Sequence, residues 1–474
     1  MAARRGTKEL HLMMGDRLLG VLVQTADTGR LELKYDDAYL SDESATPLSI
    51  SMPKAPLTYR DRALRPFLLG LLPDNDQILQ RWGARFGVSW HNPFALLAEV
   101  GEDVAGAVRF IRPERLKDVS EDSVAWLDDK TMERLLRQVR LDPGGWVESE
   151  DDRGRFSLAG AQSKIALLRE DGRWGLPNGQ LGTTHILKVA DGRFADQETV
   201  EFVTMRAARL VGLPVASVEL TRFGEEVALV VERYDRLRDE FGRVERIHQE
   251  DLCQALGVLP DVKYEREGGP GVEAVVRLLR QNLGNHADAA VERFIDALIF
   301  NWLVAGTDAH AKNYALLLYG PLAELAPLYD LTSNLPYQEP VSEHERDSRL
   351  AADRNGMKMA MSIGGENTFR GVGRPEWQRL CARISVDLDR VMGRIDEMSS
   401  QLPDAVAAAA AEATVVAASA SITKLVDRAA THVAATRRAI GLEAHPPAER
   451  TSRTPREDTA ADTAARGDPV KEVT

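Results

Sequence analysis

The hydrophobic pattern of this chain changes at about residue 236, and that change limits the folds open to it. Between residues 156 and 236, short apolar runs alternate with turn residues such as Asp171-Gly172, which predicts β-strands. Beyond residue 236, strand signals nearly vanish and helical patterns dominate, with apolar residues recurring at three- and four-residue steps. A strand-rich unit followed by a helical unit favours an α+β fold with two lobes.

The strand-rich unit carries a lysine at a position where a cation needs a partner. Its predicted elements are strands at 164–169 and 185–189, a helix at 196–211, and a hairpin formed by 218–223 and 227–232. Lys188 lies among apolar residues of the second strand, and a buried lysine requires an anion. Glu198 or Glu201 on the next helix could supply one, and the sequence does not decide between them. A solvated lysine on an edge strand is the alternative.

The helical unit contains an apolar helix that runs into a small polar cluster. Helices are predicted at 250–256, 272–283 and 288–304. After the last of these, Asp308 and Asn313 have the spacing of a protein-kinase catalytic loop, in which Asp takes a hydroxyl proton and Asn binds a metal ion. His310 and Lys312 lie between them and could touch phosphate groups. The spacing alone is weak evidence, because a polar turn after a helix contains the same residues.

A second carboxylate, Asp330, follows the apolar run that begins after Asn313. With Asn313 it would supply the oxygen ligands that Mg²⁺ prefers, although a turn or a helix cap also explains an Asp here. Leu331-Thr332 stands where the common kinase motif has Phe-Gly. The overall order of lysine-bearing strand, helix, hairpin, helices, catalytic loop and second Asp is nevertheless that of a two-lobed protein kinase.

Two further segments are candidates for nucleotide binding. In the loop 157–164, backbone N–H groups at Ala159, Gly160 and Ala161 could approach phosphate closely, because the side chains are small. This loop leads into a strand and is not a Gly-x-x-x-x-Gly-Lys-Ser/Thr loop, so a plain tight turn is the alternative. The hairpin strand 227–232 ends at Glu232-Arg233-Tyr234-Asp235, where a kinase hinge would meet adenine, and ordinary polarity at the end of a strand is the alternative. The segment 248–251 is predicted to start a helix, with its polar residues as a cap.

The first block, residues 8 to about 112, has a different character from the rest. It is predicted to contain strands at 10–14, 17–25 and 30–35, helices near 76–87 and 93–100, and a closing strand near 108. Later in the chain, 336–356 is charged and predicts a mobile insertion, while 377–398 and 406–440 predict helices. Beyond 445 large apolar residues are almost absent, which predicts disorder.

Composition excludes some classes of function. A chain of 474 residues is too long for one ordinary core, and 44% hydrophobic with 28% charged residues is typical of a globular protein. The net charge of −13 argues against a general nucleic-acid binder. Two distant cysteines, no signal-peptide run and no apolar stretch that could span a bilayer favour a cytoplasmic protein without membrane contact.

Short motifs spread along the chain resemble the HipA-type toxin kinases, which are serine/threonine kinases of bacterial toxin–antitoxin modules. In the second part of the chain these motifs are Ser157-Leu158-Ala159-Gly160-Ala161-Gln162-Ser163-Lys164, His185-Ile186-Leu187-Lys188, Glu232-Arg233-Tyr234-Asp235-Arg236, His248-Gln249-Glu250-Asp251, Thr307-Asp308-Ala309-His310-Ala311-Lys312-Asn313 and Ala326-Pro327-Leu328-Tyr329-Asp330. In the first block they are Pro47-Leu48-Ser49-Ile50-Ser51-Met52-Pro53, Leu71-Leu72-Pro73-Asp74 and Gly101-Glu102-Asp103-Val104-Ala105-Gly106-Ala107. The resemblance covers about residues 10–400.

The resemblance implies ATP and Mg²⁺ as cofactors and a role for each site residue. Asp308 would be the catalytic base, and Asn313 and Asp330 would bind Mg²⁺. The ATP-binding residues would be Ala159, Gly160, Ala161, Gln162, Lys164, Lys188, Glu232, Arg233, Tyr234, His310 and Lys312. Ser157 matches the serine that such kinases autophosphorylate, which ejects the loop and disables ATP binding. A phosphate adds about two negative charges there, which would repel the phosphates of ATP.

The resemblance also implies partners: a small helix-turn-helix antitoxin, DNA only through that antitoxin, and a protein substrate such as an aminoacyl-tRNA synthetase. Two other functions stay open, a small-molecule phosphotransferase and a non-catalytic co-repressor that supports an antitoxin on DNA. The chain departs from the family at Ser163, where members often carry an acidic residue. The insertion and the tail also look longer than expected.

We therefore predict an α+β, two-lobed protein-kinase-like fold with an N-terminal α/β subdomain and a mainly helical C-terminal lobe. The predicted divisions are a HipA-type N-terminal subdomain at 1–150, a strand-rich nucleotide-binding region at 151–236, a helical catalytic lobe at 237–400, an Ala-rich helical extension at 401–444 and a disordered tail at 445–474.

Overall fold

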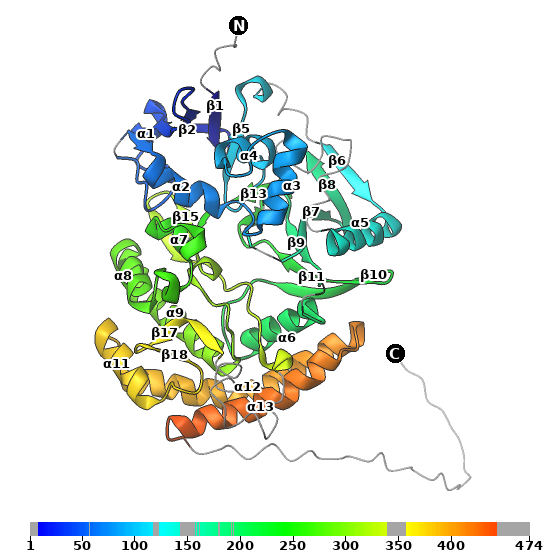
Figure 1. Ribbon diagram of the computed structural model, residues 1–474, viewed down its shortest axis with the longest axis vertical. Coiled ribbons are helices and arrows are strands. Elements are labelled where there is room, and N and C mark those ends of the chain that lie inside the picture. The colour runs from blue at the N-terminus through cyan, green and yellow to red at the C-terminus, as the bar shows by residue number, and fades with distance from the viewer. Residues whose placement is uncertain are drawn as a thin grey trace, which may run out of the picture.

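The computed structural model describes residues 8–55, 57–116, 123–142, 157, 159–160, 162–178, 181–190, 192, 194–338 and 357–442. Most of the predicted insertion and the predicted disordered tail lie outside these residues, as does Ala161. The N-terminal block lies at one end of an elongated molecule and the last two helices lie at the other, with the strand-rich and catalytic elements between them (Figure 1).

The N-terminal block is a five-stranded antiparallel sheet with helices packed against it. Its strands are β1 (Lys8–Met14), β2 (Arg17–Gln24), β3 (Leu31–Tyr35), β4 (Thr58–Arg60) and β5 (Val108–Ile111), in the order β4-β3-β2-β1-β5. Its helices are α1 (Asp37–Ser41), α2 (Asp61–Gly70), α3 (Asp76–Phe86) and α4 (Pro93–Val100). The side chains of Asn75 and Asn92 cap α3 and α4 by accepting hydrogen bonds from backbone N–H groups of the first turn. Helix α2 was not predicted, because Pro66 interrupts its pattern.

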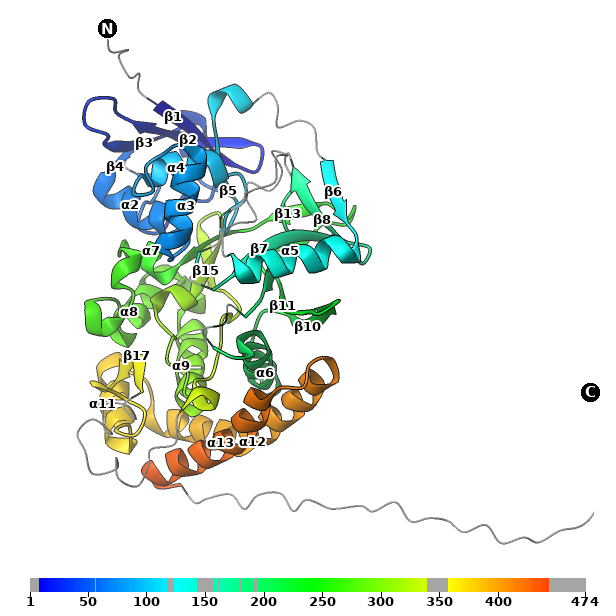
Figure 2. The ribbon, with the colours of Figure 1, turned by 45° about the vertical axis from the view of Figure 1, so that its right-hand side comes forward.

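The strand-rich region is one six-stranded sheet between two helices. Its strands are β6 (Ser123–Leu127), β7 (Lys164–Glu170), β8 (Arg173–Asn178), β9 (His185–Lys188), β10 (Val218–Phe223) and β11 (Glu226–Glu232), in the order β10-β11-β9-β7-β8-β6. Along β11, Ala228 and Val230 join the core that contains α5 (Asp129–Leu141), while Leu229 and Val231 join the core that contains α6 (Gln197–Leu210). Because side chains alternate along a strand, α5 and α6 cover opposite faces of the sheet (Figure 2).

This sheet begins earlier in the chain than predicted. Strand β6 and helix α5 precede residue 150, yet β6 forms the edge of the sheet that contains β9. The predicted division at 150/151 therefore does not separate the two sheets. Neither β6, α5 nor β8 was predicted.

The catalytic lobe is mainly helical, as predicted. It contains β12 (Arg236–Arg238), β13 (Val244–Arg246), β14 (His248–Asp251), α7 (Leu252–Leu256), α8 (Val272–Asn282), α9 (Ala287–Leu303), β15 (Ala315–Tyr319), β16 (Leu322–Leu325), β17 (Lys358–Ile363), β18 (Glu366–Thr368), α11 (Arg374–Ile384), α12 (Leu388–Val416) and α13 (Ala420–Ala439). Helix α9 is buried along most of its length, and Trp302 packs edge-on against Trp377 of α11 with ring centroids 5.6 Å apart. This packing fixes the C-terminal end of α9, from which the segment with Asp308 continues.

Four predictions for this lobe need correction. Residues 248–251 are a strand that pairs with β15, and only its last residue, Asp251, caps α7. The predicted helix 377–398 is broken at Ser385, which has φ +52°, so that α11 and α12 are separate helices. Helix α12 continues to Val416, so the predicted division at 400/401 falls inside one helix, and the predicted helix 406–440 is two.

One end of the predicted mobile insertion is ordered. Pro336 is buried in the short 3-10 helix η8 (Leu335–Tyr337), which packs against α13. Within the described ranges, none of the helices combines the length and apolar character that crossing a membrane requires.

Candidate active site

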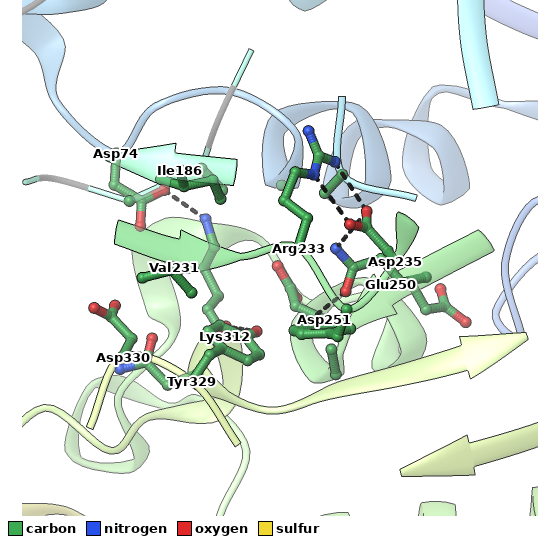
Figure 3. Close-up of a pocket in the computed structure, with 18 of the residues that line it drawn as sticks. Asp74, Ile186, Val231, Arg233, Asp235, Glu250, Asp251, Lys312, Tyr329 and Asp330 are labelled. Atoms are coloured by element: carbon green, nitrogen blue, oxygen red, sulfur yellow. Dashed lines mark hydrogen bonds and ion pairs between the residues drawn. The ribbon is translucent and has the colours of Figure 1, made fainter. Parts of the chain in front are cut away.

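A cavity lies where the N-terminal block, the six-stranded sheet and the segment after α9 meet (Figure 3). The predicted site residues that line it are Ala159, Gly160, Lys164, Lys188, Glu232, Arg233, Tyr234, Asp308, His310, Lys312, Asn313 and Asp330. Residues from five separate motifs thus reach one cavity, which the chance occurrence of short patterns would not produce.

Two carboxylates hold Lys188 in this cavity. Its Nζ lies 2.6 Å from Oε1 of Glu201 and 2.5 Å from Oδ1 of Asp330. Strand β9 lies between β11 and β7, so the reading of Lys188 as a solvated edge-strand residue is wrong. Burial opposes the charge of Lys188, but the carboxylates of Asp330 and Glu201 raise its pKa above the usual value. Of the two candidate partners on α6, Glu201 is the one that pairs with Lys188, and Glu198 is not.

The two carboxylates that hold Lys188 differ in their proton affinity. Burial raises the pKa of Glu201 to about 7, against the opposing charge of Lys188. Burial also acts on Asp330, but Lys188 and Lys164 lower the pKa of Asp330 below its usual range. Asp330 is therefore the carboxylate that stays ionised, and its φ of +58° marks a tight turn at this point.

A second lysine lies opposite Lys188 on the neighbouring strand. Lys164 on β7 is its register partner, and burial together with Lys188 lowers the pKa of Lys164 to about 8. The Nζ of Lys164 donates to the carbonyl of Ala159, and a Cβ at Gly160 would lie only 2.6 Å from that Nζ. Like charges directly opposite each other destabilise a sheet, so this pair of lysines is arranged for an anion.

The segment after α9 is a loop closed by a hydrogen bond between Asn313 and Asp308, and Asp308 lines the cavity. The Nδ2 of Asn313 donates to the backbone oxygen of Asp308 over 2.7 Å, which leaves the side-chain oxygen of Asn313 as an acceptor. The carboxylate of Asp308 is 51% exposed and accepts a hydrogen bond from the hydroxyl of Tyr264. Burial lowers the pKa of His310, so His310 is neutral at pH 7 beside Asp308.

Asn313 and Asp330 fit a magnesium ion that is bound mainly by nucleotide and water. In the part of the chain that the structure describes, no group of three or more His, Cys, Asp or Glu side chains could hold a metal. Mg²⁺ in phosphoryl-transfer sites needs only one or two protein oxygens in addition to phosphates and water. Asp330 offers an ionised carboxylate and Asn313 an amide oxygen to the same cavity.

The predicted hinge is held by buried polar contacts, among them an ion pair between Arg233 and Asp103 of the N-terminal block. The guanidinium of Arg233 donates to Asp235, to Thr183 Oγ1 over 2.9 Å and to the backbone oxygen of Val104 over 2.8 Å. Its side chain therefore fixes the hinge, while Tyr234 lines the cavity with its ring 5.7 Å from that of Tyr329.

Ser157 and Gln162 lie apart from the lining of the cavity. Ser157 is fully buried, and its Oγ donates to the backbone oxygen of Leu71 over 2.8 Å. Its N–H donates to the backbone oxygen of Asp103 over 3.0 Å, so the serine is docked on the N-terminal block. The Nε2 of Gln162 is buried without a partner among the described residues.

Several residues of the cavity were not predicted, and Asp74 is the most important. Its Oδ1 lies 2.5 Å from Nζ of Lys312, and its Oδ2 lies 2.8 Å from Nζ of Lys263. Lys312 is therefore already paired with a carboxylate, in contrast to the free phosphate contact that the sequence suggested. The motif Leu71-Leu72-Pro73-Asp74 marked the position, but a partner 238 residues away gives no local signal. Gln249, Glu250, Asp251 and Tyr329 also line the cavity.

The strand-rich lobe contains a lysine–glutamate pair, and the helical lobe contains an Asp-x-x-x-x-Asn loop and a second Asp, which forms an ion pair with Lys188. This combination defines a protein-kinase-like fold and site. Residues 156–406 match the family model of the HipA-like C-terminal domain, and residues 10–111 match that of the HipA N-terminal domain. The chain therefore belongs to the HipA family of serine/threonine-protein kinases. The predicted family and the predicted α+β, kinase-like fold are both confirmed.

Individual relatives agree with this assignment. The chain is 38% identical to the putative kinase Y4mE of Sinorhizobium fredii over 84% of this chain and 91% of the relative. It is 33% identical to the serine/threonine-protein kinase toxin HipA of Shewanella oneidensis over 71% of this chain and 77% of the relative. Among solved structures, it matches a complex of HipA, HipB and operator DNA from Shewanella oneidensis MR-1 with a TM-score of 0.76 and 27% identity, covering 91% of this chain and 98% of the other.

Proposed function

We propose that this chain uses ATP and Mg²⁺ to phosphorylate serine or threonine in a protein, as the toxin of a toxin–antitoxin module. The observation that carries the proposal is the buried lysine Lys188, held between Glu201 and Asp330 in the cavity that also contains Asp308 and Asn313. In protein kinases such a lysine must be paired with a helix glutamate before the phosphates of ATP are correctly placed.

The residues of the cavity divide the reaction between them. Lys188 and Lys164 hold the phosphates, aided by backbone N–H groups of the loop that contains Ala159 and Gly160. Asp330 and Asn313 would hold Mg²⁺, which would neutralise charge on the phosphates. Glu232, Arg233 and Tyr234 form the hinge around adenine, and His310 borders the phosphates as a neutral group.

Asp308 acts on the acceptor. Its carboxylate takes the proton of the serine or threonine hydroxyl while that oxygen bonds to the γ-phosphorus and the bond to ADP breaks. The exposure of Asp308 supports this role, because a protein acceptor has to reach the base from outside.

Ser157 is proposed as the site of autophosphorylation. Its hydroxyl is enclosed and bonded to the backbone oxygen of Leu71, so a phosphate of about two negative charges does not fit in the same place. A phosphorylated Ser157 would keep the loop away from the N-terminal block and from the nucleotide. The same burial requires the loop to leave this position before Ser157 can be modified.

Partners and location complete the proposal. A helix-turn-helix antitoxin is supported by the Shewanella oneidensis complex that contains HipB and operator DNA. Contact with DNA through the antitoxin fits the net charge of −13, which disfavours direct binding. We propose a cytoplasmic protein substrate of the translation apparatus, such as an aminoacyl-tRNA synthetase, on the basis of the family resemblance.

Mass spectrometry of the purified chain after incubation with Mg-ATP tests the proposal. We expect phosphate on Ser157 in the unmodified sequence and none in Asp308→Ala, with Mg-ATP binding measurable in both chains before any phosphate is transferred. Binding of Mg-ATP without transfer to Ser157 or to any protein would contradict the kinase function. Transfer to a small molecule alone would indicate a small-molecule phosphotransferase instead.

A further inference from the structure

Asp74 lies at the point where the N-terminal block meets the rest of the active site. It follows α2 in the segment Leu71-Leu72-Pro73-Asp74, and its side chain is only 12% exposed. Its backbone N–H donates to the backbone oxygen of Gly160 over 3.3 Å. Asp74 therefore touches the small-residue loop with its main chain and has its carboxylate free for other contacts.

Both carboxylate oxygens of Asp74 hold lysines of the catalytic lobe. Oδ1 lies 2.5 Å from Nζ of Lys312, and Oδ2 lies 2.8 Å from Nζ of Lys263 (Figure 3 shows the bond to Lys312). The side chain of Lys312 is 3% exposed, so its charge depends on this partner. A buried ammonium that loses its carboxylate is strongly destabilised, because water does not replace the contact.

The two lysines belong to the two segments that carry or contact Asp308. Lys312 precedes Asn313 in the same loop as Asp308, whose backbone oxygen accepts from Asn313. Lys263 precedes Tyr264, whose hydroxyl donates to the carboxylate of Asp308. One carboxylate of the N-terminal block thus ties together the loop of the base and the residue that hydrogen-bonds to it.

We propose that Asp74 is a positioning residue for phosphoryl transfer, and that the N-terminal block sets the geometry of Asp308 through it. Asp74 acts through Lys312 and Lys263, which donate to its two carboxylate oxygens, and the proposal assigns Asp74 no direct role in holding the acceptor or the nucleotide. The inference rests on the proposed kinase function. A displacement of the base by about 1 Å is enough to lower a rate by about 100-fold, so loss of this anchor acts on the chemical step.

The test compares Asp74→Asn with Asp76→Asn in the full chain. Asp76 is exposed at the start of α3, so its variant makes the same chemical change two residues away without touching the catalytic lobe. The measurements are kcat for autophosphorylation, Mg-ATP affinity by calorimetry, and amide hydrogen exchange of residues 306–314. The exchange measurement reports on the loop whether or not the protein is active.

We expect Asp74→Asn to lower kcat by about 10- to 100-fold, to change Mg-ATP affinity by less than about threefold and to speed exchange in residues 306–314. Asp76→Asn should stay within about twofold of the unmodified chain in kcat and affinity. Unchanged kcat and exchange in Asp74→Asn would overturn the inference. So would a loss of ATP affinity as large as the loss of kcat, which would make Asp74 a nucleotide-binding residue.

A second variant and a readout that does not depend on activity distinguish failure of this inference from misfolding and from failure of the proposed function. If Asp74→Asn does not fold, Lys263→Met removes one of the two contacts at the more exposed lysine and should lower kcat with ATP affinity retained; full activity in this variant would overturn the inference. If the unmodified chain binds Mg-ATP but transfers no phosphate, the proposed function fails. In that case faster loop exchange in Asp74→Asn alone would still support the anchor, and its absence would overturn it.

Discussion

The Nζ of Lys188 on β9 lies 2.6 Å from Oε1 of Glu201 on α6, and both side chains are almost completely buried. A second glutamate on the same helix, Glu198, is also buried but does not pair with the lysine. Helix α6 thus presents one glutamate to Lys188, which lines the cavity, while the other glutamate makes no contact with Lys188.

This difference predicts that Glu201→Gln and Glu198→Gln have unequal effects. Glu201→Gln should lower kcat/KM for ATP by about 10- to 100-fold, because a hydrogen bond to a charged group contributes about 1.5–3 kcal/mol. Glu198→Gln should change kcat/KM by less than about twofold, since Glu198 makes no contact with Lys188. Initial rates of autophosphorylation over a range of ATP concentrations measure both. Equal losses in the two variants would mean that α6 acts through stability alone.

The order of the elements, and the strand or helix on which each motif lies, could be predicted from the sequence because both depend on local patterns of residues. Lys188 was placed on a strand and Asp308 after an apolar helix, and β9 and α9 have these positions. The choice between Glu198 and Glu201 could not be predicted, since it depends on how α6 is rotated against the sheet.

Contacts between distant segments were also beyond prediction. Lys312 and Asp74 are 238 residues apart, and neither has a neighbour that signals the other. Strand β14 was mistaken for the start of a helix, because His248-Gln249-Glu250-Asp251 has no apolar alternation. It is a strand because it pairs with β15, and Ser49 and Ile50 of the N-terminal block donate to the side-chain carboxylate of Glu250 on it.

Lys164 should be a residue whose removal stabilises the nucleotide-free protein but impairs its function. Burial and the charge of Lys188 lower the pKa of Lys164 from 10.5 to about 8, so the folded state resists its protonation. Lys164→Met removes this cost and should raise the free energy of unfolding at pH 7. The same variant should bind Mg-ATP at least about tenfold more weakly, because it lacks a phosphate contact.

The stabilisation by Lys164→Met should depend on pH in a defined direction. Below about pH 8 Lys164 is protonated in both the folded and the unfolded chain, so the full cost is present. As the pH rises from about 8 towards 10.5, the folded chain has released this proton while the unfolded chain still binds it, and the unmodified protein gains stability. Denaturant titrations at pH 7 and pH 9.5 should therefore give a smaller difference between the two proteins at the higher pH. A constant difference would show that Lys164 does not titrate in this range.

Ser157 should tolerate a small neutral side chain better than a charged one. Ser157→Ala leaves the backbone oxygen of Leu71 buried without its donor, which should cost about 1–3 kcal/mol of stability but preserve Mg-ATP binding. Ser157→Glu places a larger, charged side chain in a fully buried position and should abolish detectable Mg-ATP binding in calorimetry. Ser163→Ala is the matched control, because the Oγ of Ser163 is buried without a partner among the described residues. Normal ATP binding by Ser157→Glu would rule out the docking of this loop as a requirement for binding.

Arg428 on α13 should stabilise the segment that follows Asp330. Its Nη1 donates to the backbone oxygens of Leu335, Pro336 and Gln338 over 2.8, 3.2 and 2.7 Å. Arg428→Met leaves these carbonyls without that donor, so we expect faster amide exchange in residues 331–338 and a loss of about 1–3 kcal/mol in the free energy of unfolding.

Lys424→Met, at an exposed position one turn earlier on α13, removes the same charge without this contact and should leave both quantities unchanged. Arg428→Lys should restore little, because a single ammonium does not reproduce the reach and planar geometry of the guanidinium. Because α13 lies beyond the family-matched residues 156–406, a clear effect of Arg428→Met on autophosphorylation would make this helix a working part of the catalytic lobe. Unchanged exchange in residues 331–338 would instead show that η8 is held by its own packing.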